Sequence, residues 1–224
     1  MGFKVKDLNQ QIIKFNYDKS LKDDDFYVSK SNDHILKFLN NWPKWEKNFF
    51  NINGEKFSGK THLINIFQKK FGGIIIESKN LNDDSLNKIK FNQNIILENL
   101  EKKVDEKLLF TLINFIEQDN KFLIVTSKEP IVDIKFNLDD LNSRTKNFLM
   151  QSIIKPDDNL IFALILKNLS DRQILLNEKL INYIIKHIDR SYSKIFDFIY
   201  KIDEISLKRK KPIDFKIIKE ALED

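Results

Sequence analysis

Short apolar runs and amphipathic stretches alternate along the chain up to residue 155. Five runs are nearly continuous in apolar residues and have the length of buried strands, at 49–53, 74–76, 94–97, 122–126 and 148–153. Helical spacing is found at 62–71 and 105–118, and shorter helices are expected through 35–39 and at 85–89 and 138–145. Apolar strands that alternate with helices predict a parallel sheet covered by helices on both faces.

The pattern changes at Lys155-Pro156, and everything after it has helical spacing. Helices are predicted at 158–167, 177–187, 191–207 and 214–222. We therefore predict an α/β fold with a parallel five-stranded sheet, followed by a small all-helical domain. The expected organisation is a flexible tail at 1–20, an α/β nucleotide-binding domain at 21–155 and the helical domain at 156–224.

The segment Gly54-Glu55-Lys56-Phe57-Ser58-Gly59-Lys60-Thr61 matches the phosphate-loop pattern G-x-x-x-x-G-K-[ST] at every fixed position. It lies between a predicted strand and a predicted helix, as its chemistry requires. The glycines let backbone N–H groups curl around phosphates, and the helix N-terminus adds partial positive charge. Lys60 can reach the terminal phosphates, and the Thr61 hydroxyl can ligate Mg²⁺. With only 5 Gly in the chain, an ordinary turn explains this spacing poorly, so the segment predicts nucleotide binding.

Composition excludes several other classes of site. The chain has no Cys, which excludes disulfides, thiolate metal sites and Cys nucleophiles. The three histidines, at positions 34, 62 and 187, have no spacing that would bind a metal. The chain has neither an apolar signal segment nor an uncharged apolar run long enough to cross a membrane, so a soluble intracellular protein is expected.

The charge of the chain is mildly basic, with 38 Lys+Arg against 33 Asp+Glu and a net charge of +5. The lysines are spread along the sequence and form no stripe typical of a nucleic-acid interface. One dense cluster, Lys208-Arg209-Lys210-Lys211, is expected to be a solvated turn between two helices. Non-specific contact of this cluster with DNA is the alternative.

A phosphate-loop protein of this type needs a second acidic site at the end of a neighbouring strand. Glu98 follows the run at 94–97 and is the candidate to hold Mg²⁺; the alternative is a polar strand end without function. Asn99 stands where an acidic base is usual, and an amide cannot take a proton, so slow or absent hydrolysis is expected. Thr126 and Ser127 end the next strand, where a hydroxyl could face the terminal phosphate or only cap the strand.

Taken together, these residues resemble the DnaA/Hda branch of the AAA+ ATPases, most closely its short regulatory members. Besides the phosphate loop, the resemblance rests on segments in the same order and spacing as in that branch, namely Phe26-Tyr27-Val28, Ser31-Asn32, Trp42-Pro43-Lys44-Trp45, Leu109-Phe110, Asp140-Leu141-Asn142-Ser143-Arg144, Pro156-Asp157-Asp158 and Asp189-Arg190-Ser191. It covers nearly the whole chain and implies that the helical domain is a lid over the nucleotide.

The resemblance implies a set of site residues around ADP or ATP with Mg²⁺. Adenine would lie against the segment that contains Asn32. The nucleotide would also contact Gly54, Lys56, Ser58, Gly59, Lys60, Thr61, His62 and, from the lid, Arg190. Thr61 and Glu98 would hold Mg²⁺. Spacing alone favours an exposed arginine with a local salt bridge at Arg144, whereas the resemblance makes it an arginine finger that acts in trans.

The tail contains Gln10-Gln11-Ile12-Ile13-Lys14-Phe15, which is similar to the peptide by which regulators of this branch dock on the DNA-polymerase sliding clamp. Gln10, Ile13 and Phe15 would fill the anchor positions. An amide and two apolar side chains on a flexible tail suit a docking pocket. The alternative is a tail strand that packs on its own domain.

Two positions depart from the initiators of the branch. Glu98-Asn99 replaces an acidic pair, and the lid arginine that senses the terminal phosphate would align near Ser193, which is not basic, with Arg190 and Lys194 close by. Initiators carry a further helix-turn-helix domain for origin DNA, which would need residues beyond Asp224, so this chain is not expected to be the initiator itself.

The expected function is therefore regulation of replication initiation in the bacterial cytoplasm, with a DnaA-type initiator and the sliding clamp as partners and self-association as a further possibility. The regulator would dock on the clamp and promote ATP hydrolysis by the initiator. The alternatives are a small AAA+ ATPase that loads or remodels a helicase, and a nucleotide-stabilised adaptor without catalytic contribution.

Overall fold

The computed structural model describes residues 26–223, and its first domain is built on a five-stranded sheet in which every paired strand is parallel. The strand order is β2-β3-β4-β1-β5. The strands are β1 (Phe49–Asn53), β2 (Ile74–Glu77), β3 (Asn94–Leu100), β4 (Phe122–Ser127) and β5 (Leu149–Ser152). The parallel five-stranded α/β domain predicted from the sequence is thus confirmed.

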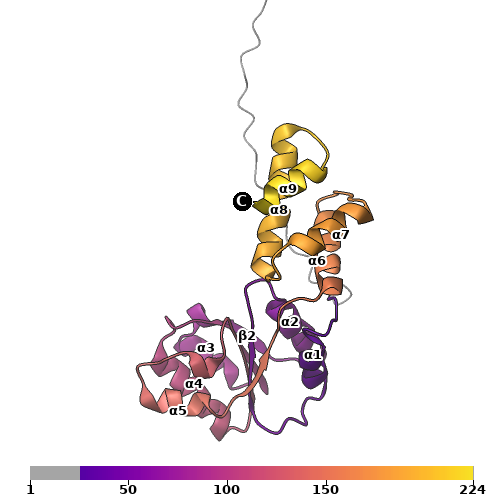
Figure 1. Ribbon diagram of the computed structural model, residues 1–224. Coiled ribbons are helices and arrows are strands. Elements are labelled where there is room, and N and C mark those ends of the chain that lie inside the picture. The colour runs from indigo at the N-terminus through magenta and orange to yellow at the C-terminus, as the bar shows by residue number, and fades with distance from the viewer. Residues whose placement is uncertain (1–25, 224) are drawn as a thin grey trace, which may run out of the picture.

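Helices cover both faces of the sheet, with α1 (Asp33–Asn40) and α2 (Lys60–Phe71) on one face (Figure 1). The other face carries α3 (Asp83–Ile89), α4 (Glu106–Gln118) and α5 (Asp139–Thr145), and two short 3₁₀ turns, η2 (Ser78–Asn80) and η3 (Ile131–Asp133), complete the connections. Successive strand residues belong to different cores: Ile96 packs with α1 and α2, and its neighbours Ile95 and Leu97 pack with α3 and α4. This alternation explains why the strands are apolar throughout.

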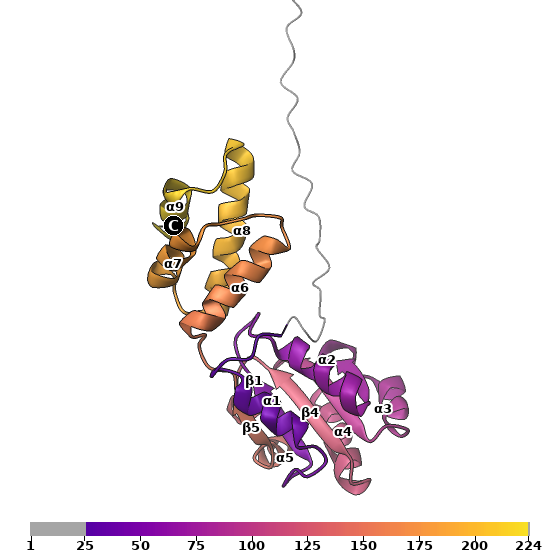
Figure 2. The ribbon, with the colours of Figure 1, turned by 90° about the vertical axis from the view of Figure 1, so that its right-hand side faces the viewer.

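The helices after residue 157 form the predicted lid, which stands beyond one end of the sheet (Figure 2). They are α6 (Asp158–Ser170), α7 (Glu178–His187), α8 (Tyr192–Arg209) and α9 (Phe215–Glu223). The lid has its own core of buried apolar side chains, drawn entirely from residues 161–221. No helix among the described residues is long and apolar enough to span a membrane.

Capping side chains explain where several helices begin. The Asp157 carboxylate accepts the Leu160 N–H at 2.8 Å, and the Asn177 amide oxygen accepts the Leu180 N–H at 2.9 Å. Each bond satisfies one of the N–H groups that a helix leaves without an internal partner, typically stabilising it by about 1 kcal/mol. The lid helices α6 and α7 therefore begin at positions that the sequence itself specifies.

Asn51 joins β1 to the end of β4, beside the loop that leaves this strand. Its side chain is fully buried; its amide nitrogen donates to Val125 O at 3.0 Å and to Ser127 Oγ at 2.9 Å. Its amide oxygen accepts the Ile131 N–H at 3.0 Å. These bonds fix the segment between β4 and η3, which contributes Lys128 to the site described below.

The structure differs from the sequence prediction mainly at the ends of elements. β3 continues past position 97 to Leu100, with a register irregularity between Leu97 and Leu100. β5 is shorter than the run at 148–153 because Phe148 ends a turn, where its ring packs 5.2 Å from that of Phe49. The clamp-binding peptide predicted at 10–15 lies outside the described residues.

Candidate nucleotide-binding site

The phosphate loop connects β1 to α2, and its glycines are required by the local geometry. A Cβ on Gly54 would lie 2.9 Å from Ser58 Oγ and 3.1 Å from Ile153 Cβ, which leaves no room for a larger residue. Gly59 has a φ of 97°, in the left-handed region that favours glycine. It directly precedes Lys60, where α2 begins, so a bound phosphate would face the N-terminus of a twelve-residue helix.

Two polar groups of the loop are arranged to receive phosphate oxygens. The Lys60 ammonium donates to the backbone oxygens of Gly54 at 2.7 Å and Glu55 at 2.9 Å, both within the loop. The pKa of Lys60 is lowered, because the effect of burial exceeds the opposite effect of the negative charges of Glu98 and Glu55. The Ser58 hydroxyl is buried and has no hydrogen-bond partner among the described residues. A polyphosphate would satisfy the Ser58 hydroxyl and offset the desolvation of Lys60.

The structure brings together the two residues predicted to hold Mg²⁺. The Thr61 hydroxyl donates to the Glu98 carboxylate at 2.5 Å, although the residues are 37 positions apart. Among the residues described, no three His, Cys, Asp or Glu side chains cluster as a metal site. Mg²⁺ is usually bound through one or two protein oxygens together with phosphates and water, which Thr61 and Glu98 could supply.

Asn99 also lies at the cavity, at the irregular end of β3 with a left-handed φ of 55°. Its backbone N–H donates to Thr126 Oγ1 at 2.9 Å, and its amide donates to Glu77 Oε1 at 3.1 Å. The Thr126 hydroxyl is therefore engaged within the sheet, as is that of Ser127, which favours a strand-end role for both. No proton acceptor stands at position 99.

A cavity of about 960 Å³ lies between the phosphate loop and the lid. Its walls come from the segment before α1, the phosphate loop, the residues that follow β2, β3 and β4, and the lid helices α6 and α8. The charged side chains among them are the lysines Lys56, Lys60, Lys79, Lys128 and Lys167 and the carboxylates Glu77, Glu101 and Asp171. The cavity lies at the carboxyl ends of parallel strands, where such sheets bind ligands, and its excess of cations suits a polyanion.

Asn32 and His62 both line this cavity. The Asn32 side chain binds its own segment, because it accepts the Ser29 N–H at 2.9 Å and donates to Tyr27 O at 3.0 Å. The His62 ring lies 5.1 Å from that of Phe26 in an edge-on contact. Arg190 is not among the lining residues and instead donates to the Asp158 carboxylate at 2.6 Å.

Comparisons with known proteins match the helical domain to one family model and the chain to one fold. Residues 157–222 match the family model of the lid domain of Hda. In fold, the chain is similar to domain III of the replication initiation protein DnaA from Thermotoga maritima, with a TM-score of 0.71 and 19% identity over 91% of this chain and 96% of that one. The helical domain is thus similar to the lid domain of Hda, and the chain has the fold of domain III of DnaA.

Two further relatives extend the comparison. AMPPCP-bound DnaA from Aquifex aeolicus has a TM-score of 0.65 and 20% identity, over 85% of this chain and 68% of that one. An uncharacterized protein of Haemophilus influenzae is 28% identical over 192 residues, which are 78% of this chain and 81% of that protein.

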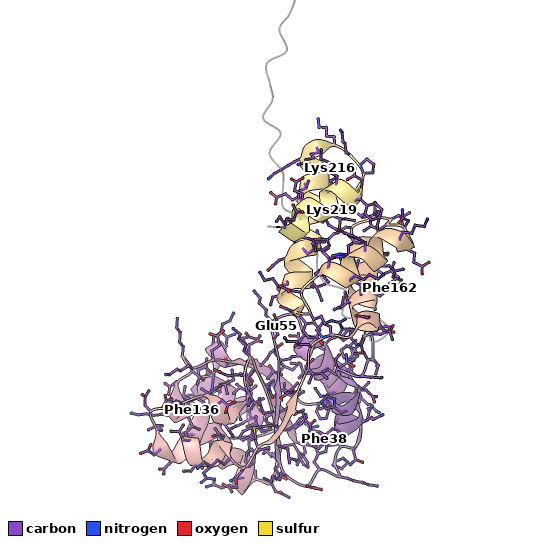
Figure 3. The ribbon with its side chains drawn as sticks, in the orientation of Figure 1. Phe38, Glu55, Phe136, Phe162, Lys216 and Lys219 are labelled. Carbon is purple, nitrogen blue, oxygen red and sulfur yellow. The ribbon has the colours of Figure 1, made fainter. Side chains whose placement is uncertain are left out.

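The phosphate loop contacts the lid directly, at Glu55 (Figure 3). The Glu55 carboxylate accepts hydrogen bonds from the Ser191 hydroxyl, from the Tyr192 N–H at 2.9 Å and from the Ser193 N–H at 3.3 Å. Burial raises the pKa of Glu55, but these hydrogen bonds together lower it by more, so the pKa lies below its ordinary value. The Ser193 N–H is thus bound to a carboxylate of its own chain.

Arg144 lies at the end of α5, away from the cavity of its own chain. Its guanidinium donates to the Glu117 carboxylate of α4 and lies 5.7 Å from the ring centroid of Phe110. At the other end of α5, the Glu106 carboxylate accepts the N–H groups of Asn137 at 3.0 Å and Leu138 at 2.9 Å. Helix α4 therefore holds α5, and with it Arg144, at both ends.

Sequence reasoning missed several residues of this site. Lys128 directly follows β4, and the rule that ligands bind beyond the carboxyl ends of strands would have found it. Glu55 and Phe57 occupy variable positions of the loop pattern, and Tyr192 and Phe196 appear in the sequence only as residues of a helix. Nothing in the sequence signals that these four would meet.

Proposed function

We propose that this protein is a nucleotide-binding regulator of replication initiation that acts on a DnaA-type initiator. ADP or ATP binds in the cavity between the phosphate loop and the lid. The desolvated Lys60 ammonium, the buried Ser58 hydroxyl and the excess of lysines support this placement. The A. aeolicus relative was solved with AMPPCP, an analogue of ATP.

Thr61 and Glu98 would hold Mg²⁺ together with the phosphates, and the ion would neutralise phosphate charge there. Glu98 orients the Thr61 hydroxyl and keeps a negative charge beside Lys60. With Asn99 in place of a base, turnover by the protein itself is slow or absent.

The observation that carries the regulatory part of the proposal is the position of Arg144. Its side chain contacts α4 and is not among the residues that line the cavity of its own chain, so it cannot reach its own nucleotide without a large rearrangement. A partly exposed guanidinium at the end of a fixed helix suits delivery to the ATP of a neighbouring initiator. Such a charge in trans is worth on the order of 10³–10⁵ in hydrolysis rate.

Gln10, Ile13 and Phe15 would dock the protein on the sliding clamp, and the site of action would be the bacterial cytoplasm. Docking would raise the effective concentration of Arg144 near initiators at replicating DNA. Both statements rest on the resemblance and on the tail sequence.

The test is ATP hydrolysis by the cognate initiator, alone and with this protein plus DNA-loaded clamp. We expect stimulation that needs the clamp and is lost in Arg144→Ala. Arg144→Lys, which keeps the charge but not the planar fork, should retain an intermediate effect. Lys37→Ala is the control, since it removes a cation from an exposed ion pair with Asp33 on α1.

The same assay separates the two alternatives. ATP turnover by this protein alone, abolished by Lys60→Ala and without effect on the initiator, would favour a small ATPase that loads or remodels a helicase. Clamp binding without either activity would favour an adaptor.

A further inference from the structure

The contact between Glu55 and the lid involves donors that a helix cannot satisfy by itself. Tyr192 and Ser193 are the first two residues of α8, and their N–H groups have no acceptor within the helix. The Glu55 carboxylate accepts both, together with the Ser191 hydroxyl. A negative charge at a helix N-terminus is also favoured by the helix dipole. A side chain of the phosphate loop therefore caps a helix of the lid.

Phe57, two residues further along the loop, makes a second contact with the same helix. Its ring stacks on that of Phe196, with centroids 4.3 Å apart and an interplanar angle of 14°. Phe57 has a φ of 68°, in a backbone region that L-residues with a side chain rarely adopt. Such a conformation persists only where the surroundings hold it, and here the ring packs against the lid.

Tyr192 adds a third attachment, through its side chain. Its side chain is buried, and its hydroxyl donates to Ile154 O at 3.0 Å in the segment that connects β5 to α6. In Figure 3, Glu55 lies where the lid meets the α/β domain. All three attachments are between groups of the protein itself, so none of them requires nucleotide.

We propose that Glu55 and Phe57 are positioning residues that latch the lid onto the phosphate loop before nucleotide binds, and that opening of this latch sets the rates of nucleotide entry and release. This inference rests on the proposed nucleotide site. The first half of the loop holds α8 through Glu55 and Phe57, and Ser58 and Lys60, which follow them, would hold the phosphates. Because the cavity lies between this loop and the lid, opening of the latch would widen the path by which nucleotide enters and leaves.

Hydrogen exchange of the nucleotide-free protein tests the latch by itself. The amides of Tyr192 and Ser193 should exchange at least tenfold more slowly than unprotected amides, because the Glu55 carboxylate is their acceptor within residues 26–223. In Glu55→Ala this protection should disappear, while the amides of α7 keep theirs. Unprotected Tyr192 and Ser193 amides in the wild-type protein would overturn the proposal.

Stopped-flow kinetics with a fluorescent ADP analogue, N-methylanthraniloyl-ADP, test the gating. In Glu55→Gln, which keeps the shape of the side chain but not its charge, both the association and dissociation rates should rise about tenfold, and Kd should change less than threefold. Glu55→Asp, which is too short to reach α8, should behave in the same way. Glu46→Gln, at an exposed position of the same domain, is the matched control.

The outcomes separate the latch from the site on which it rests. A rise in the dissociation rate alone would make Glu55 an ordinary binding residue and overturn the gating. Unchanged rates despite lost amide protection would also overturn it. If the wild-type protein binds no nucleotide, the proposed site fails, and gating fails with it, while the exchange experiment still reports whether the lid is held to the loop.

Discussion

Replacing Arg144 by Ala distinguishes a side chain that serves a second protein from one that serves its own fold. The side chains of Arg144 and Glu117 are 32% and 52% exposed, so their ion pair contributes about 0–1 kcal/mol to stability. The contact of the guanidinium with the Phe110 ring adds about 0.5–1 kcal/mol. The variant should therefore lose at most about 2 kcal/mol of unfolding free energy.

The expected loss of function is much larger. If Arg144 stabilises the transition state on the initiator, stimulated hydrolysis should fall on the order of 10³, which corresponds to about 4 kcal/mol. Urea unfolding followed by circular dichroism measures the first quantity, and phosphate release by the clamp-assembled initiator measures the second. Glu117→Ala is the matched variant, because it removes the same ion pair and leaves the guanidinium in place.

Two results would refute this reasoning. One is an Arg144→Ala protein that loses more than about 3 kcal/mol of stability, since the exposed contacts cannot account for that much. The other is an equal loss of stimulation in Glu117→Ala and Arg144→Ala, since the ion pair rather than the guanidinium would then carry the activity.

Three further predictions follow from buried or charged groups of the α/β domain. Asn51→Leu should lower the unfolding free energy by about 2–4 kcal/mol in urea titrations, because it leaves the Ile131 N–H and the Val125 carbonyl without their buried partner; an unchanged midpoint would contradict this. Glu98→Gln should weaken nucleotide binding about tenfold in Mg²⁺ and hardly at all in EDTA, by isothermal titration calorimetry; an equal loss in both buffers would exclude a metal role. The lowered pKa of Glu55 means that its contribution is complete above its ordinary value of 4.5 and is lost as the pH falls through the lower folded value. Below pH 4.5, thermal melts of the wild type and Glu55→Gln should therefore converge, and a constant gap would contradict the assignment.

The sequence is sufficient to predict the parts of the site that depend on a contiguous motif or on the ends of parallel strands. The phosphate loop is contiguous, so its pattern alone placed Lys60 and Thr61 at the start of a helix. The need for a second acidic site at a strand end predicts Glu98, and the carboxyl ends of β1 and β3 share one edge of the sheet although β4 lies between them. The hydrogen bond from Thr61 to Glu98 agrees with that inference.

The parts that could not be predicted depend on how the two domains meet. The contact of Glu55 with the first turn of α8 joins positions 136 to 138 residues apart, and neither partner has an unusual sequence signature. Arg190 is the converse case, a residue that the sequence places at the site but whose side chain lies elsewhere. It lies close in sequence to the first turn of α8, yet its side chain turns to Asp158 rather than to the cavity. Side-chain direction at a domain junction is decided by packing, which spacing alone does not encode.

The separate core of the lid has a consequence for how the chain unfolds. Its buried side chains come from residues 161–221. Among the described residues of the lid helices, Leu160 and Tyr192 are buried instead in the core that packs on the sheet. Two hydrophobic units joined by so few buried residues need not melt together, so a single midpoint can average two transitions. A ligand that bridges both units would stabilise them jointly and draw the transitions toward each other. The difference between the unfolding midpoints of the two domains, compared with and without nucleotide, would then measure how strongly the lid and the α/β domain are coupled.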